Sequence, residues 1–432
     1  MRNGDVTVPD EARVPAEGSY HPTTALVLSG GGARGAYAVG VVAALNEILG
    51  GLRAKLQIFT GTSVGAINAA HFASCAHRND LGVAELVRRY ESLRLRTHLR
   101  PHLGGLRKAL VDGGRRPPPL HPTRHGLCLL DPTPFEEMVC HEIPWARLHR
   151  NIEQGLVHAL IVSGLRISDG RTTTFAELAP DTKFVFSHDP RRDAVTGTIS
   201  ADHVLASAAL PLLFPARRIG TDFYCDGGLR FNTPMAPAIR AGAERLVVIA
   251  LRAGKRSAPG SMVESMLRRY PKPFFLLGKV LDALLLDPIE YDLHVLDRLN
   301  RLVEVMEETM APPALDRIQA VLEKERGLPY AQIQTLVFRP SEDIGVLAGD
   351  YMRSEQPTRR EAFAARTFLR HAGALGEHVE ADFVSYLLFD GGFARRLIEL
   401  GYRDARARAD EIRRFFAPVT APIRGLVPSG SA

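Results

Sequence analysis

Short apolar runs and segments of helical spacing alternate along the first part of the chain. Apolar runs at residues 24–29 and 56–59 each end in a glycine-containing turn, and a small-residue segment of helical character follows each turn. An apolar run bounded by turn residues predicts a buried strand, and apolar positions three and four residues apart predict a helix. Further strands are predicted at residues 158–167, 183–187 and 245–251. The pattern therefore predicts two consecutive strand–turn–helix units, followed by further strands.

The pattern changes near residue 255, after a polar run typical of a linker. Residues 261–326 have apolar positions at helical spacing, and residues 333–339 form one more apolar run. The expected organisation is a flexible leader over residues 1–23, a first domain over residues 24–254, and a mainly helical region over residues 255–432 that returns residues 333–339 to the sheet as a strand.

Composition and charge narrow the choice of partners. The 432 residues are 45% apolar, which is enough for a sizeable core. The formal net charge is +6 and is carried by dispersed arginines. This charge favours anionic surfaces, either phospholipid headgroups or nucleic acid, and it is also typical of an arginine-rich proteome. The apolar stretch at residues 273–288 either packs on the core as a helix or lies on a membrane surface.

The cysteines and the apolar runs bear on the cellular compartment. Four cysteines occur without paired spacing, which argues against a disulfide framework and against a CxxC metal site. The first residues lack the apolar core of a secretion signal, and no run of about 18 apolar residues is present. We therefore expect a cytoplasmic protein, at most peripheral to a membrane, without a metal or another cofactor.

The turn after the second predicted strand carries a serine between two glycines. It reads Gly61, Thr62, Ser63, Val64, Gly65. A G-x-S-x-G sequence between a strand and a helix is typical of a nucleophile elbow, a sharp turn that exposes the serine hydroxyl at a helix N-terminus. The glycines relieve crowding against the backbone of such a turn. A glycine- and serine-rich loop without chemistry is the alternative.

The turn after the first predicted strand is rich in glycine. It reads Gly30, Gly31, Gly32, Ala33, Arg34, Gly35. Such a loop presents backbone N–H groups to an anion. It fits the dinucleotide pattern G-x-G-x-x-G, but no acidic residue closes the following strand, and the Gly-Lys-Ser/Thr of a P-loop is missing. Because the serine elbow follows within one strand–helix unit, an oxyanion hole is the leading interpretation.

A third motif lies far downstream. The apolar run Phe223–Cys225 ends in Asp226, Gly227 and Gly228. By itself this is a common turn sequence.

Together, GGGARG, GTSVG and DGG, in this order and each after a predicted strand, resemble the motifs of the patatin-like phospholipase family. The blocks SAALPLLFP and LLDPTPF also look like family blocks, and the similarity covers residues 24–252. The resemblance implies an α/β fold of three α/β/α layers around a mostly parallel sheet. It also implies hydrolysis of fatty-acyl esters, as by a phospholipase A or a lysophospholipase. The expected partner is then a phospholipid or another fatty-acyl ester, with membrane association at the periphery and without nucleic acid.

The resemblance also implies roles for the motif residues, in a Ser–Asp dyad. Ser63 would be the nucleophile and Asp226 the proton acceptor. A serine hydroxyl needs a base, and an aspartate with its ordinary pKa near 4 is a weak one, so close contact and a good oxyanion hole are required. The backbone N–H groups of Gly31, Gly32 and Ala33 are the proposed donors. Arg34 either orients a phosphate or is a buried structural cation.

Three alternatives stay open at this point. The glycine-rich loop could serve a non-catalytic lipid- or nucleotide-binding module. The chain could also be a membrane-surface effector whose helical C-terminal half recruits it to lipid or to a partner. The third is a Ser–His–Asp triad, because His294, His371 and His378 follow Asp226 in the chain order of some hydrolases.

Overall fold

The structure is a computed structural model of the chain. It describes residues 20–94, 100–101, 124–125, 130–211, 213–253, 288–353 and 380–419. Most of the predicted leader, up to residue 19, and residues 273–287 of the apolar stretch lie outside the described residues.

Five parallel strands form the centre of the sheet. In spatial order they are β12 (Gln334–Phe338), β11 (Arg245–Ile249), β1 (Thr24–Leu28), β2 (Ile58–Gly61) and β6 (Ala159–Arg166). The residues of β11, β1 and β2 are buried throughout. Continuous apolar runs are what a parallel strand covered on both faces requires. β12 comes from the last part of the chain and pairs with β11, so that Leu336 lies beside Val247.

Antiparallel strands extend the sheet beyond β6. β7 (Thr172–Leu178) pairs with one edge of β6, and β8 (Arg192–Thr196) follows it. β10 (Asp222–Asp226) pairs with β6 as well, and β9 (Ala216–Ile219) and β4 (Arg124–His125) continue from it. The prediction of a strand at residues 183–187 is wrong, because this segment lies outside the ladders. The strand that pairs with this edge of β6 is the threonine-rich β7, whose residues are almost all buried.

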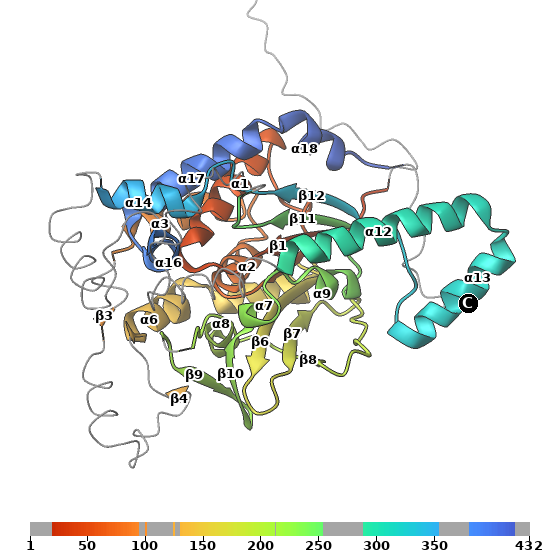
Figure 1. Cartoon of the computed structure of the whole chain (residues 1–432), viewed down its shortest axis with the longest axis horizontal. Coiled ribbons are helices and arrows are strands. Elements are labelled where there is room, and N and C mark those ends of the chain that lie inside the picture. Colours follow the sequence, from red (N-terminus) through yellow and green to blue (C-terminus); the bar gives the residue numbers. More distant parts are fainter. Residues whose placement is uncertain are drawn as a thin grey trace, which may run out of the picture.

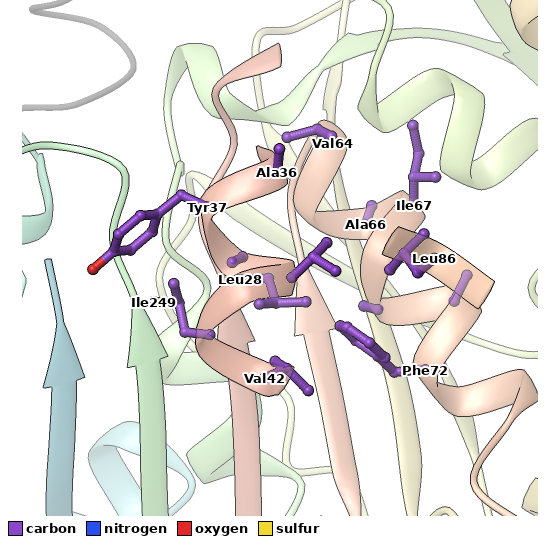
Figure 2. Close-up of a cluster of buried hydrophobic side chains, with 14 of the residues drawn as sticks. Leu28, Ala36, Tyr37, Val42, Val64, Ala66, Ile67, Phe72, Leu86 and Ile249 are labelled. Carbon is purple, nitrogen blue, oxygen red and sulfur yellow. The ribbon is translucent and has the colours of Figure 1, made fainter. Parts of the chain in front are cut away.

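Helices cover both faces of the sheet, so the fold has three layers. On one face, Leu26 and Leu28 of β1 pack against α1 (Ala36–Ile48) and α2 (Val64–Ser74). On the other face, Ala25 and Val27 pack in a cluster with α9 (Met235–Arg240) and α12 (Pro288–Thr309). Alternate residues of a strand point to opposite faces, which is why one strand serves both clusters. Figure 2 shows Leu28 and Ile249 of the strands in one cluster with Val42 of α1 and Phe72 of α2. The predicted α/β class with a mostly parallel sheet is confirmed.

The remaining elements lie around this centre (Figure 1). They are η1 (Gly32–Gly35), α3 (Val83–Ser92), β3 (Arg100–Pro101), β5 (Leu130–Asp131), α6 (Thr133–Glu142), α7 (Trp145–Glu153), α8 (Ala201–Ser207), η2 (Gly227–Leu229), α13 (Pro312–Arg326), α14 (Ile344–Arg353), α16 (Glu380–Leu387), α17 (Gly391–Arg406) and α18 (Ala409–Phe415). Helices α12 and α13 lie at one end of the molecule, and α6 and α14 lie at the other. No helix in the described ranges has both the length and the apolar character to cross a membrane.

The last part of the chain shares the main core. Helix α17 packs along α1 (Figure 1). A glycine lies on each side of this contact. A Cβ atom on Gly40 would lie 2.0 Å from the carbonyl oxygen of Ile398, and one on Gly401 would lie 2.2 Å from that of Tyr37. The two helix backbones are therefore in direct contact. Burial of this face ties residues 391–406 to the helix that follows the glycine-rich loop.

Candidate active site

Ser63 occupies a strained turn between β2 and α2. Its φ is 56° and its ψ is −130°, and a positive φ is uncommon for a residue with a Cβ atom. The flanking glycines make the turn sterically feasible. A Cβ atom on Gly61 would lie 2.2 Å from the carbonyl oxygen of Gly65, and one on Gly65 would lie 2.3 Å from that of Leu28. This geometry is that of a nucleophile elbow.

Hydrogen bonds from distant segments hold the elbow in place. The Ser63 N–H donates to Ser207 Oγ at 2.9 Å, and the Ser207 hydroxyl donates to the Ser163 carbonyl at 2.7 Å. The Thr62 hydroxyl donates to the Phe231 carbonyl at 3.1 Å. Ser207 is fully buried at the end of α8. The elbow is thus tied to β6 and to the segment after η2.

Strand β6 brings Asp226 to Ser63. Gly61, the last residue of β2, pairs with Val162 of β6, and Asp226, the last residue of β10, pairs with Gly164 of β6. Because β7 takes the other edge of β6 along its length, β2 and β10 lie on the same edge. The two strands run in opposite directions relative to each other, so their C-terminal ends meet. The aspartate therefore lies beside the elbow, although 162 residues lie between Ser63 and Asp226 in the sequence.

The Ser63 side chain and the Asp226 carboxyl line the same pocket. Asp226 is 1% exposed, and burial raises its pKa to about 7, against the lowering effect of its interactions with Ser63 and with the Gly228 N–H. The Gly228 N–H lies 2.7 Å from Asp226 Oδ1 and fixes the carboxyl orientation. A pKa near 7 suits a general base at neutral pH much better than the ordinary value of an aspartate.

Gly227 allows the chain to turn tightly against β6. A Cβ atom at this position would lie 2.3 Å from the carbonyl oxygen of Ser163, the same carbonyl that accepts from Ser207. In the Asp-Gly-Gly sequence, position 227 must therefore be glycine because a side chain would collide with β6. Position 228 contributes its backbone N–H, which donates to the Asp226 carboxylate.

The glycine-rich loop lies next to Ser63 and leaves donors unused. The Gly30 N–H donates to Asn232 Oδ1 at 3.0 Å, and the Arg34 N–H donates to the Gly31 carbonyl at 3.2 Å. Within the described part of the chain, the N–H groups of Gly31, Gly32 and Ala33 have no hydrogen-bond acceptor in the protein. Gly31 and Gly32 line the same pocket as Ser63 and Asp226. Unused backbone donors beside a serine are what an oxyanion hole needs.

Arg34 points into the protein and contacts the C-terminal part of the chain. Its side chain is buried, its Nε donates to Ser385 Oγ at 2.8 Å, and its guanidinium lies 4.0 Å from the centre of the Tyr386 ring. Arg34 does not line the Ser63 pocket. Of the two interpretations of this arginine, these contacts favour the buried structural cation. Gly35, the last residue of the loop, packs against Val64, with a hypothetical Cβ atom 2.7 Å from Val64 Cγ2.

The pocket around Ser63 is mostly apolar. Phe135 and Phe214 stack there with ring centres 5.9 Å apart. Two further segments complete its wall: the block after α8, with Ala208, Leu210 and Leu213, and the end of α16, with Tyr386, Leu387 and Phe389. No sequence motif marks α16, so the sequence does not predict a site residue there. The sequence does not predict roles for Ser207 and Asn232 either, although Ser207 opens the SAALPLLFP block.

A histidine is absent from the residues that line this pocket in the described structure. His294 is exposed on α12, and the other two candidates for a triad, His371 and His378, lie outside the described residues. The described residues also contain no group of three or more His, Cys, Asp or Glu side chains that could hold a metal ion.

Comparisons with known proteins agree with the motifs. A family model described as patatin-like phospholipase matches residues 26–239. Among curated proteins, no sequence matches the chain significantly. A solved structure of human GIVD cytosolic phospholipase A2 is similar, with 12% identity, a TM-score of 0.43 and coverage of 91% of this chain and 60% of that chain. VipD from Legionella pneumophila has 13% identity, a TM-score of 0.33 and coverage of 90% and 67%. This chain thus spans about 60% of the length of the human protein.

Proposed function

Residues 26–239 belong to the patatin-like phospholipase family, so the chain is a lipid acyl hydrolase at the level of that family, and we propose that it cleaves fatty-acyl esters through a Ser63–Asp226 dyad. The proposed substrates are phospholipids or lysophospholipids, as for a phospholipase A or a lysophospholipase. The net charge of +6 supports a further part of the proposal, peripheral attachment to anionic membranes.

The position of Ser63 and Asp226 in one pocket, where β2 and β10 end beside each other on β6, carries the proposal. In the first step, Asp226 takes the hydroxyl proton while Ser63 Oγ attacks the ester carbonyl carbon. The tetrahedral intermediate collapses, the bond to the alcohol oxygen breaks, and that oxygen takes the proton from Asp226. The product of this step is an acyl-enzyme with an ester at Ser63.

The second half of the reaction repeats these steps with water. Asp226 takes a proton from water, the hydroxide attacks the acyl carbon, and the proton passes to Ser63 Oγ as the fatty acid leaves. Asp226 thus acts first as a base and then as an acid, both in acylation and in deacylation. A pKa of about 7 suits both roles at neutral pH.

The glycine-rich loop would stabilise the negative oxygen of each tetrahedral intermediate. The N–H groups of Gly31, Gly32 and Ala33 are fixed donors, and loss of one donor in such a site typically costs about 10²–10³ in rate. Ser207 keeps the Ser63 N–H occupied, so that amide is not among the proposed donors.

Two substitutions test the dyad. Ser63→Ala and Asp226→Asn should each reduce hydrolysis of a phospholipid and of a simple aryl ester to the background rate, with unchanged circular dichroism. Asp222→Asn is the matched control, because Asp222 lies on the same strand but outside the pocket. Full activity of Asp226→Asn would exclude the dyad.

A fluorophosphonate probe separates the enzyme from the alternative, a non-catalytic lipid- or nucleotide-binding module. The enzyme should be labelled at Ser63, and labelling should disappear in Ser63→Ala. A wild-type protein that binds phospholipid but never reacts with the probe would favour the binding module.

A further inference from the structure

A second cavity adjoins the pocket at Ser63, on the side of α3 and α6. Val64, Ile67, Phe135 and Phe389 line both cavities, so the two share a wall and have a common boundary. The rings of Phe135 and Phe389 lie 6.4 Å apart at this boundary. The second cavity is therefore the direct neighbour of the Ser63 pocket, and only these shared side chains lie between the two.

The second cavity has an apolar surface. Beyond the shared residues, its lining includes Leu86, Met138, Val139 and Ile143. Ile67 and Leu86 lie close together on the side of α2 away from Tyr37 (Figure 2). Such a surface favours hydrocarbon over any polar group, because burial of apolar area stabilises the bound state by about 25 cal/mol per Å².

The polar side chains in the lining are mostly paired with protein groups. The Tyr90 hydroxyl donates to Asn68 Oδ1 at 3.0 Å, and Asn68 Nδ2 donates to the Gly35 carbonyl at 3.2 Å. These groups are satisfied without a ligand, so they do not select for a polar one.

The cavity extends along one face of α2. Val64, Ile67 and His71 line it at spacings of three and four residues, which places them on one side of the helix. From Val64 to His71 the helix rises by roughly 10 Å. The cavity thus leads away from Ser63 as an elongated space.

A charged cluster lies at the end of the cavity away from Ser63. Arg89 Nε lies 3.3 Å from Glu142 Oε2, and the same guanidinium contacts Glu85 and lies 3.3 Å from His71 Nδ1. His71 Nε2 lies 3.0 Å from the Gly82 carbonyl, which fixes the imidazole between the two partners. The apolar lining therefore ends at an ion pair between α3 and α6.

We propose that the second cavity holds the acyl chain of the substrate, and that the Arg89–Glu142 pair limits the length of the chain. The ligand class is a single unbranched hydrocarbon chain, which has its carboxyl carbon at Ser63 and extends past the shared side chains Val64 and Ile67 into the second cavity. This proposal rests on the proposed esterase function for its kinetic test, and a binding test keeps the two separable.

The kinetic test uses Met138→Trp, which fills the second cavity without touching the Ser63 pocket. The kcat/KM for a palmitoyl aryl ester should fall by about tenfold or more, and that for the butyryl ester should stay within about twofold. The matched control is His141→Trp, an exposed position on the same helix, which should leave both values unchanged. If Met138→Trp fails to fold, Met138→Phe adds a smaller side chain to the cavity, and the same two kcat/KM values are measured with that variant.

The binding test uses an intrinsically fluorescent long-chain fatty acid as the probe. It should bind wild type and His141→Trp equally and bind Met138→Trp about tenfold more weakly. An unchanged chain-length profile together with unchanged binding in both Met138 variants would overturn the proposal. Weakened binding in a protein without esterase activity would support the cavity and contradict the proposed function.

Discussion

Asp226 lies beside Ser63 in one pocket, at a site where its carboxyl is 1% exposed. The interaction with Ser63 alone would lower the pKa of Asp226, whereas burial raises it. Burial is the larger effect here and brings the pKa to about 7. Asp226 can thus exchange a proton with Ser63 near neutral pH, which an aspartate in water cannot do efficiently.

The first prediction concerns the pH dependence of activity. The base must be ionised before it can accept the Ser63 proton, so kcat/KM should rise with pH and reach half of its plateau near pH 7. The measurement is hydrolysis of an uncharged aryl ester between pH 5 and pH 9. A rate that stays constant down to pH 5 would contradict the raised pKa.

The second prediction concerns stability. The pKa of Asp226 is raised in the folded state, so the unfolded chain binds fewer protons between the ordinary pKa of 3.8 and about 7. The contribution of Asp226 to stability is therefore fully present below about pH 4 and is lost as the pH rises to 7. Asp226→Asn removes this loss and should raise the free energy of unfolding at pH 8 by up to about 4 kcal/mol, which corresponds to the rise in pKa from 3.8 to about 7, while it abolishes activity.

The measurement for Asp226→Asn is urea unfolding at pH 4.5 and at pH 8. The variant should gain stability over wild type only at the higher pH. Asp222→Asn, on the same strand, should show no such pH-dependent gain. A variant that is less stable than wild type at pH 8 would show that the carboxylate is well solvated in the folded protein.

The third prediction concerns Ser207. Its hydroxyl accepts from the Ser63 N–H and donates to the Ser163 carbonyl, and all three groups are buried. Ser207→Ala leaves a buried donor and a buried acceptor unpaired, so it should lower the free energy of unfolding by about 1–3 kcal/mol. It should also lower kcat more than it changes KM, because the elbow loses the group that fixes the Ser63 backbone.

Ser168→Ala is the control for Ser207→Ala, because Ser168 is exposed at the end of β6 and its hydrogen bond is at the surface. It should change neither stability nor kcat. An equal loss in both variants, or a loss of stability without any loss of kcat in Ser207→Ala, would contradict the positioning role.

The fourth prediction concerns Gly32 in the glycine-rich loop. Its φ is 57°, and a Cβ atom there would lie 2.2 Å from the carbonyl oxygen of Tyr386. Gly32→Ala should therefore push the loop away from α16 and displace the oxyanion donors, with a loss of about 10²–10³ in kcat. Gly50→Ala is a matched control, since Gly50 has a φ of 64° and open space around it.

The comparison of the two glycine variants separates conformational strain from loop displacement. In both variants, an alanine with a positive φ destabilises the folded protein by about 1 kcal/mol. Only the Gly32 variant also meets a neighbouring backbone. If both variants kept wild-type kcat, the contact between the loop and α16 would have no part in catalysis.

The motifs at the turns of the site are visible in the local sequence. Each glycine-containing turn directly follows an apolar run, so the family and the α/β class could be predicted without coordinates, and both are confirmed. The contacts that require glycine are only partly local. A Cβ atom on Gly61 would meet the nearby Gly65 carbonyl, whereas Gly65 and Gly32 face Leu28 and Tyr386 from other elements.

Apolar runs alone did not determine strand pairing. Residues 183–187 have the composition of a strand but lie outside the ladders, whereas the polar sequence TTTFAEL forms β7. The difference is the partner, because β7 satisfies its backbone groups on the free edge of β6. A single run of residues carries no information on which edge is available.

Only the tertiary structure decided how distant segments meet at Ser63. The chain order of the motifs says nothing of distance, and the shared edge of β6 is what brings the ends of β2 and β10 together. Burial then sets the pKa of Asp226, which depends on packing from several elements. The contributions of Ser207 and Tyr386 have the same origin: each acts through one hydrogen bond or contact made by a residue far away in the chain, and such contacts have no local pattern.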